Sequence, residues 1–128
     1  MVIDSSALLA VLLQEPAAQR ISDAIEAADV RLMAVANALE AAMVIEARSG
    51  IAGARDLDRL LLDSRVEIVP VTPEHFDLAR EAWRRYGKGR HPAALNICDC
   101  LAYALAKATG EPLLFVGNDF AKTDVAAA

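Results

Sequence analysis

Hydrophobic and polar positions follow two different periods along this chain. Short apolar runs at 2–3, 31–35, 66–69 and 113–116 predict strands, because they are brief, compact and rich in Val, Ile and Leu. The stretches between them place apolar residues three or four positions apart, which predicts helices. We expect those helices over residues 6–13, 16–28, 37–48, 53–63, 73–86 and 95–108. Strands that alternate with helices favour a parallel or mostly parallel sheet covered by helices on both faces.

The helix boundaries carry their own signals. Thr72 and Pro73 are typical of the first two positions of a helix, and Gly50 and Gly110 predict helix ends. Residues 123–125 are the candidate for an additional strand. We therefore predict one α/β domain over residues 1–128, a three-layer α/β/α sandwich with a short, mostly parallel sheet of four or five strands.

Composition agrees with a single folded domain. The chain has 128 residues, of which 55% are hydrophobic, and only 5% are aromatic, so the core is expected to consist of Ala, Leu, Val and Ile. Cys98 and Cys100 are two apart in a predicted helix, point to different faces and are not expected to form a disulfide. Without a signal peptide or an apolar stretch of membrane-spanning length, we expect a cytoplasmic protein with no membrane association.

Four acidic residues interrupt the most apolar parts of the chain: Asp4, Glu40, Asp99 and Asp119. Acids are seldom buried without partners, because removing their charge from water is costly. Asp4 and Asp119 follow predicted strands, and active sites of parallel sheets form beyond the carboxyl ends of strands. We therefore expect the four acids to converge on a site for a hard cation, Mg²⁺ or Mn²⁺, as the chain has no Cys/His cluster.

Each acid also has a structural interpretation. Asp4 is a suitable helix N-cap, Glu40 favours the start of a helix dipole, and Asp119 is typical of a turn. Asp99 interrupts an apolar helix, where Asp is unfavourable; its alternative is a buried hydrogen bond to a backbone amide, which we consider the weaker interpretation. Three residues nearby are candidates for supporting the acids: Ser6, Asn96 and Asp124.

Charge is distributed unevenly. The net charge of −5 argues against general nucleic-acid binding, yet residues 80–90 contain five basic residues and one acidic residue. A solvated helix face is the ordinary interpretation of such a run. The alternative is a contact surface for a phosphate chain, and its candidate residues are Arg84, Arg85, Lys88 and Arg90.

Several segments in order resemble the PIN-domain ribonucleases, and among them the VapC toxins of VapBC type II toxin–antitoxin systems. These are the opening residues 1–8, the stretch 86–96, residues 99–106, and the closing segments 112–115, 117–120 and 123–125. The resemblance implies that Asp4, Glu40, Asp99 and Asp119 are the family's Mg²⁺- or Mn²⁺-binding quartet. It also implies cleavage of RNA, commonly tRNA or ribosomal RNA, a homodimer, and inhibition by a VapB-type antitoxin.

Two positions depart from the family pattern. Residues 34–36 are Ala, Val and Ala where the family often has Ser or Thr, and Cys98 stands where Gly is frequent. Two rival functions remain at this stage. A phosphatase with Asp4 as nucleophile typically needs a second acid two residues on, where this chain has Ser6; a non-catalytic binding module would keep the acids without using them.

Overall fold

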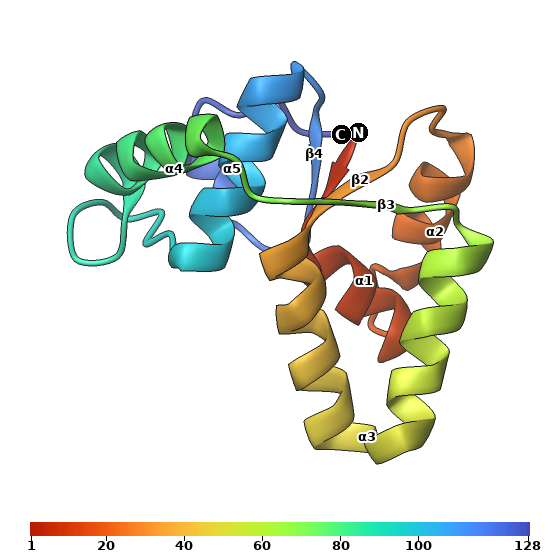
Figure 1. The fold of residues 1–128 in the computed structure, drawn as a ribbon. Helices are drawn as coiled ribbons and strands as arrows, with labels where there is room; N and C mark the ends of the chain where they lie inside the picture. The colour runs from red at the N-terminus through yellow and green to blue at the C-terminus, as the bar shows by residue number, and fades with distance from the viewer.

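The computed structural model describes residues 1–128 and contains one four-stranded sheet (Figure 1). The strands are β1 (Val2–Ile3), β2 (Leu32–Ala34), β3 (Glu67–Val69) and β4 (Leu113–Leu114). Their order in the sheet is β3-β2-β1-β4, and every neighbouring pair is parallel. The predicted parallel sheet is thus confirmed. The additional strand over 123–125 is wrong, because the C-terminal stretch contributes only an isolated bridge between Leu113 and Ala127.

Five α-helices and one 3-10 turn connect and follow the strands. They are α1 (Ser5–Leu12), α2 (Ala18–Ala27), α3 (Val35–Asp63), α4 (Pro73–Tyr86), α5 (Ile97–Thr109) and η1 (Phe120–Lys122). The two helices predicted over 37–48 and 53–63 are the two arms of α3, which bends sharply at their junction (Figure 1). Gly50 makes the bend with φ 60° and ψ −149°, a conformation that is accessible essentially to glycine alone.

Helices cover both faces of the sheet, as predicted. Successive strand residues point to opposite faces, so Val2 lies in one core and Ile3 in the other. On the first side Val2 packs with Leu95, Leu105 and Leu113, beneath α4 and α5. On the second side Ile3 packs with Met33 of β2 and Leu114 of β4 against helix residues of α1, α2 and α3: Leu8, Ile21 and Ala41. Figure 1 shows the same division, with α4 and α5 on one side of the strands and α1, α2 and α3 on the other.

This topology gathers chemistry at one edge of the sheet. Because the strands are parallel, the residues that follow β1, β2 and β4 all leave the sheet at the same edge. These residues are Asp4, the first turns of α3 and the loop that leads to Asp119. No helix of the protein combines the length and the apolar character needed to span a membrane.

Candidate active site

Asp4 is the most deeply buried acid of the chain, with 2% of its surface exposed. It is the N-cap of α1, as its structural interpretation predicted: Oδ2 accepts hydrogen bonds from the Ser6 backbone N–H at 3.0 Å and from Ser6 Oγ at 2.5 Å. Oδ1 accepts a bond from Asn37 Nδ2 at 2.9 Å. Burial raises the pKa of Asp4, and the charge of Glu40 raises it further, against the hydrogen bonds from Ser6. Asp4 is therefore both the N-cap of α1 and a carboxylate on which the charge of Glu40 acts.

Ser6 has a second role beside the cap. Its Oγ also accepts a hydrogen bond from the Val116 backbone N–H at 3.1 Å, just beyond β4. Through the Ser6 hydroxyl, Asp4 is connected by hydrogen bonds to Val116, in the segment that leads to Asp119. The predicted supporting position of Ser6 thus lies between two of the four acids.

Glu40 lies half-buried in the second turn of α3. Its Oε2 accepts a hydrogen bond from Ser5 Oγ at 2.5 Å, so the first residue of α1 holds a carboxylate of α3. Asn37, one turn earlier in α3, donates to Asp4. The two helices are therefore joined by polar contacts at the edge of the sheet where Asp4 lies.

Asp99 does not interrupt the interior of a helix, and this expectation is wrong. The backbone takes φ 52° at Ala94 and α5 begins only at Ile97, so Asp99 is the third residue of the helix. It forms a capping box with Asn96: Asn96 Oδ1 accepts from the Asp99 backbone N–H at 2.9 Å, and Asp99 Oδ2 accepts from the Asn96 backbone N–H at 2.8 Å. Asp99 thus does bond to a backbone amide, but this bond is exposed and not buried as the alternative interpretation predicted.

The electrostatics of Asp99 show which groups surround it. Burial raises its pKa to about 6, the hydrogen bond from Asn96 opposes the rise, and the charges of Asp4, Glu40 and Asp119 add to it. Carboxylates raise one another's pKa only when they are close. The charges of Asp4, Glu40 and Asp119 thus all act on Asp99. That the four acids form one cation site stays a prediction.

Asp119 differs from the others because it is exposed. It precedes η1 in the turn after β4, and its side chain makes no cap bond there. Of the four acids, three are thus partly or fully buried, and Asp119 is exposed.

A divalent cation suits the donors of this site. All four side chains offer carboxylate oxygens, the ligands that Mg²⁺ and Mn²⁺ prefer, and no basic residue neutralises them. One further oxygen, Asn37 Oδ1, is buried without a hydrogen-bond partner. No three His, Cys, Asp or Glu side chains lie close enough together to enclose an ion, so a cation would have to draw the carboxylates inward.

Two polar residues of the site were missed by the sequence reasoning. Asn37 is wholly buried and Ser5 is nearly so, although both are polar. A signal for Asn37 was present, because it lies three residues before Glu40 on the same face of an alanine-rich helix. No comparable pattern distinguished Ser5 from Ser6.

Cys98 lies beside the acids, at the position that departs from the family pattern. Burial raises the pKa of its thiol to about 11, and the charges of Glu40, Asp99 and Asp4 contribute. Such a thiol stays protonated near neutral pH and is a weak nucleophile. Cys98 and Cys100 are both free.

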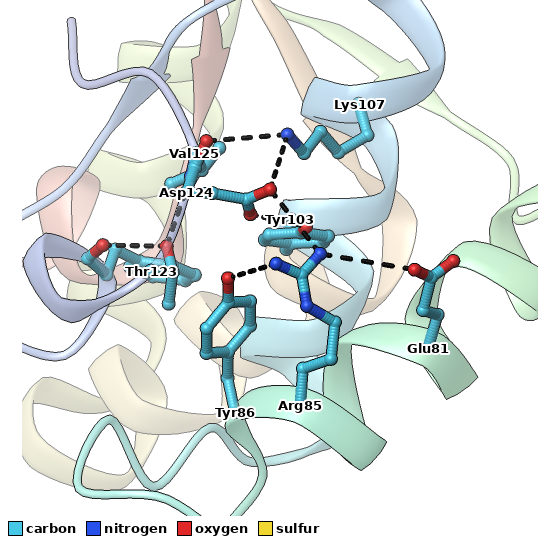
Figure 2. A network of polar contacts seen from close by, with 9 residues as sticks. Glu81, Arg85, Tyr86, Tyr103, Lys107, Thr123, Asp124 and Val125 are labelled. Atoms are coloured by element: carbon cyan, nitrogen blue, oxygen red, sulfur yellow. Dashed lines mark hydrogen bonds and ion pairs between the residues drawn. The ribbon is translucent and has the colours of Figure 1, made fainter.

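Asp124 takes part in a different network (Figure 2). Its carboxylate accepts a hydrogen bond from Tyr103 Oη at 2.7 Å and forms ion pairs with Lys107 at 3.2 Å and Arg85 at 3.4 Å. The hydrogen bond from Tyr103, together with the charges of Lys107 and Arg85, lowers the pKa of Asp124 to about 2. Asp124 therefore fastens the C-terminal segment to α4 and α5.

The four basic candidates occupy different settings. Arg85 belongs to the Asp124 network and also lies 4.0 Å from Glu81 (Figure 2). Arg84 and Lys88 are exposed and form no ion pair. The guanidinium of Arg90 lies 4.0 Å from the centre of the Trp83 ring. Three of the four thus remain available to a phosphate chain, and Arg85 is largely engaged within the protein.

Comparison with known proteins agrees with this arrangement. The model of the PIN domain family matches residues 1–126. The chain is 54% identical to Ribonuclease VapC30 of Mycobacterium tuberculosis over 126 residues, covering 98% of this chain and 96% of the relative. It is 53% identical to Ribonuclease VapC of Mycolicibacterium smegmatis over 127 residues, covering 99% and 98%. The chain therefore belongs to the PIN domain family and, within it, to the VapC ribonucleases.

Solved structures show the same fold. The structure of Mycobacterium tuberculosis VapC20, described as a sarcin-ricin loop cleaving toxin, matches with a TM-score of 0.80 at 15% identity and covers 99% of this chain and 97% of that one. A toxin–antitoxin complex from Klebsiella pneumoniae matches with a TM-score of 0.71 at 16% identity, covering 99% and 95%. At these identities the likeness concerns the fold.

Proposed function

We propose that this protein is a metal-dependent endoribonuclease toxin that hydrolyses phosphodiester bonds of RNA, with tRNA or ribosomal RNA as the expected targets. The observation that carries the proposal is the set of contacts at the carboxyl edge of the sheet, where Asn37 of α3 donates to Asp4 and Ser5 of α1 donates to Glu40. Its support is the raised pKa of Asp99, to which the other three charges contribute. The names of the relatives with more than half of their residues identical point to the same activity.

The roles of the residues follow from their contacts. Asp4, Glu40, Asp99 and Asp119 would hold Mg²⁺ or Mn²⁺, which when bound supplies positive charge for the phosphate and lowers the pKa of a water molecule. Asn37 and Ser6 fix the orientation of the Asp4 carboxylate, and Ser5 fixes that of Glu40. Asn96 holds Asp99 through the capping box, and this is the supporting role we assign to it.

The basic residues would position the substrate. Arg84, Lys88 and Arg90 follow one another at the end of α4 and in the loop toward α5, whose first turn supplies Asp99. A phosphate chain held by these cations would pass close to the acids. Asp124 and Arg85 would contribute indirectly. Their ion pair would hold the C-terminal segment that contains Asp119 in place.

A protein inhibitor and a second copy are the expected partners. Five large apolar side chains of α3 are exposed: Val35, Leu39, Met43, Ile51 and Leu62. A cavity of about 360 Å³ between Leu39, Met43 and Cys98 also has Glu40 in its wall. A VapB-type antitoxin that covered this face would block the acids, and we propose it as the partner there; we also propose a homodimer and a cytoplasmic location.

Cleavage of RNA by the purified, antitoxin-free protein tests the proposal. Total RNA is incubated with Mg²⁺, with Mn²⁺ or with EDTA, and the ends of the fragments are mapped. We expect discrete fragments that require the metal, and their loss in Asp99→Asn. Glu46→Gln, which changes an exposed acid of α3, is the matched control and should cleave like the parent.

Each alternative predicts a different result. Metal-independent cleavage, or full activity of Asp99→Asn, would contradict the proposal. A folded protein that binds neither Mn²⁺ nor RNA would indicate a non-catalytic binding module. A covalent phosphate on Asp4 would indicate a phosphatase, although Ser6 at the position of its second acid donates a hydrogen bond to Asp4.

A further inference from the structure

An apolar pocket of about 580 Å³ opens between α4 and the start of α5. This volume lies within the range of small-ligand sites. Two aromatic side chains in its wall remain open to solvent: Phe76 is 57% exposed and Trp83 is 44% exposed. The apolar part of the wall is completed by Val71, Ala79, Leu95, Ile97, Cys100 and Leu101. Exposed aromatic rings in a wide pocket offer flat surfaces on which a planar group can stack.

The pocket adjoins the acidic site. Asn96 and Ile97 line it, and Asn96 is the N-cap that holds Asp99 through the capping box. The same turn of the chain thus forms a wall of the pocket on one side and supports a carboxylate on the other. A ligand in the pocket would be separated from the acids by this single turn.

The rim of the pocket is basic. Arg80 lies with its guanidinium 5.2 Å from the centre of the Phe76 ring, and Lys88 is part of the wall. Arg90 lies over the Trp83 ring at 4.0 Å. Arg80 also forms an ion pair with Asp77 at 3.4 Å, whereas Lys88 and Arg90 have no acidic partner. These two unpaired cations beside the pocket suit a polyanion.

The indole of Trp83 is held in place by the backbone. A Cβ atom at Gly87 would lie 2.5 Å from Trp83 Cδ1, so only glycine leaves room for the ring there. A ring fixed in this way loses little freedom when another ring stacks on it.

We propose that this pocket binds an unpaired nucleobase of the RNA substrate, stacked against Trp83, next to the phosphate that reaches the acids. Arg80 and Lys88 contact the phosphates on either side of that nucleotide. The inference rests on the proposed function and adds a base-binding subsite to it. Proteins that recognise unpaired RNA commonly stack its bases on aromatic side chains between cations.

Trp83 is the only tryptophan of the chain, so its fluorescence reports on the pocket directly. The protein is titrated in EDTA, which prevents metal-dependent cleavage, with short single-stranded RNAs and with matched RNAs that carry one abasic nucleotide. We expect the base-containing RNAs to quench the fluorescence. The RNA that lacks the base in the pocket should bind through its phosphates with much weaker quenching.

Variants separate stacking from folding. Binding of labelled RNA is measured for Trp83→Ala, Trp83→Phe and the control Val30→Ala, which truncates an apolar side chain of similar exposure outside the pocket. Loss of the stacked ring should weaken binding about 5- to 100-fold in Trp83→Ala. Trp83→Phe should restore most of the affinity, and Val30→Ala should bind like the parent.

Three results would overturn the inference. RNA binding without any change in Trp83 fluorescence, or equal quenching by abasic RNA, would place the bases elsewhere while leaving the ribonuclease proposal intact. Quenching that depends on protein concentration alone, with a dimer that Trp83→Ala dissociates in sedimentation, would show that a second copy covers the pocket. Absence of RNA binding altogether, with no cleavage in Mg²⁺, would end both proposals.

Discussion

Replacing Asp99 by asparagine should stabilise the fold while it removes the activity. The pKa of Asp99 is raised from 3.8 to about 6, first by burial and then by the neighbouring carboxylates. An acid with a higher pKa in the folded chain binds its proton more tightly there, so its ionisation destabilises the fold as pH rises from about 4 to about 6. Asparagine carries no charge, and its Oδ1 can still accept the capping bond from Asn96.

The size of the effect follows from the two pKa values. A difference from 3.8 to about 6 corresponds to roughly 3 kcal/mol for a fully shielded group. Asp99 is only partly buried, so water screens the repulsion and we expect a gain of about 1–2 kcal/mol at pH 7.5. At pH 4.5 the parent is mostly protonated at this position, and the gain should shrink to roughly a third.

Urea unfolding followed by circular dichroism measures this gain. Both proteins are compared in EDTA at pH 4.5 and pH 7.5, and then in Mg²⁺ at pH 7.5. Mg²⁺ should stabilise the parent more than Asp99→Asn, because a ligand stabilises the state that binds it. If the variant is less stable than the parent at both pH values, the ionised carboxylate at position 99 does not destabilise the fold, and the reasoning from its raised pKa is refuted.

Three further substitutions test other parts of the structure by urea unfolding. Asn37→Ala removes the buried donor to Asp4 and should cost about 1–3 kcal/mol; a cost near zero would contradict the contact. Gly87→Ala brings a Cβ within 2.4 Å of the Trp83 carbonyl oxygen, so it should cost about 1–3 kcal/mol and shift the fluorescence spectrum, and an unchanged spectrum would refute the clash. Asp124→Asn should cost under about 1 kcal/mol at pH 7, since Asp124 is exposed. Because the pKa of Asp124 is about 2, the parent loses this advantage as pH falls from about 4 toward 2, and a difference that persisted there would contradict the ion pairs.

The sheet and its covering helices could be predicted because their signals are local. Short apolar runs marked all four strands, and the three-residue spacing of apolar side chains marked the helices. The two arms of α3 were predicted as separate helices over 37–48 and 53–63, but the sequence did not show that one continues directly into the other at Gly50. The absence of a strand over 123–125 was not predictable, because pairing there depends on the neighbouring edge of the sheet.

The four acids could be singled out from the sequence, but most of their contacts could not. Asp4, Glu40, Asp99 and Asp119 stood out because each is unusual in its apolar surroundings. The position of Asp99 within its helix was misjudged, since the left-handed backbone at Ala94 delays the start of α5 and has no sequence signal of its own. Asp124 looked like a candidate ligand, and only the folded chain brings Tyr103, Lys107 and Arg85 around it.

The pairing of β1 with β4 has a consequence for the order of events during protein synthesis. Val2 and Ile3 pair with Leu113 and Leu114, so β1 can pair with β4 only after more than a hundred further residues have been synthesised. Asp4 and Asp119 are then brought together only when the chain is nearly complete. A nascent chain therefore cannot bring Asp4 and Asp119 together for most of its time on the ribosome.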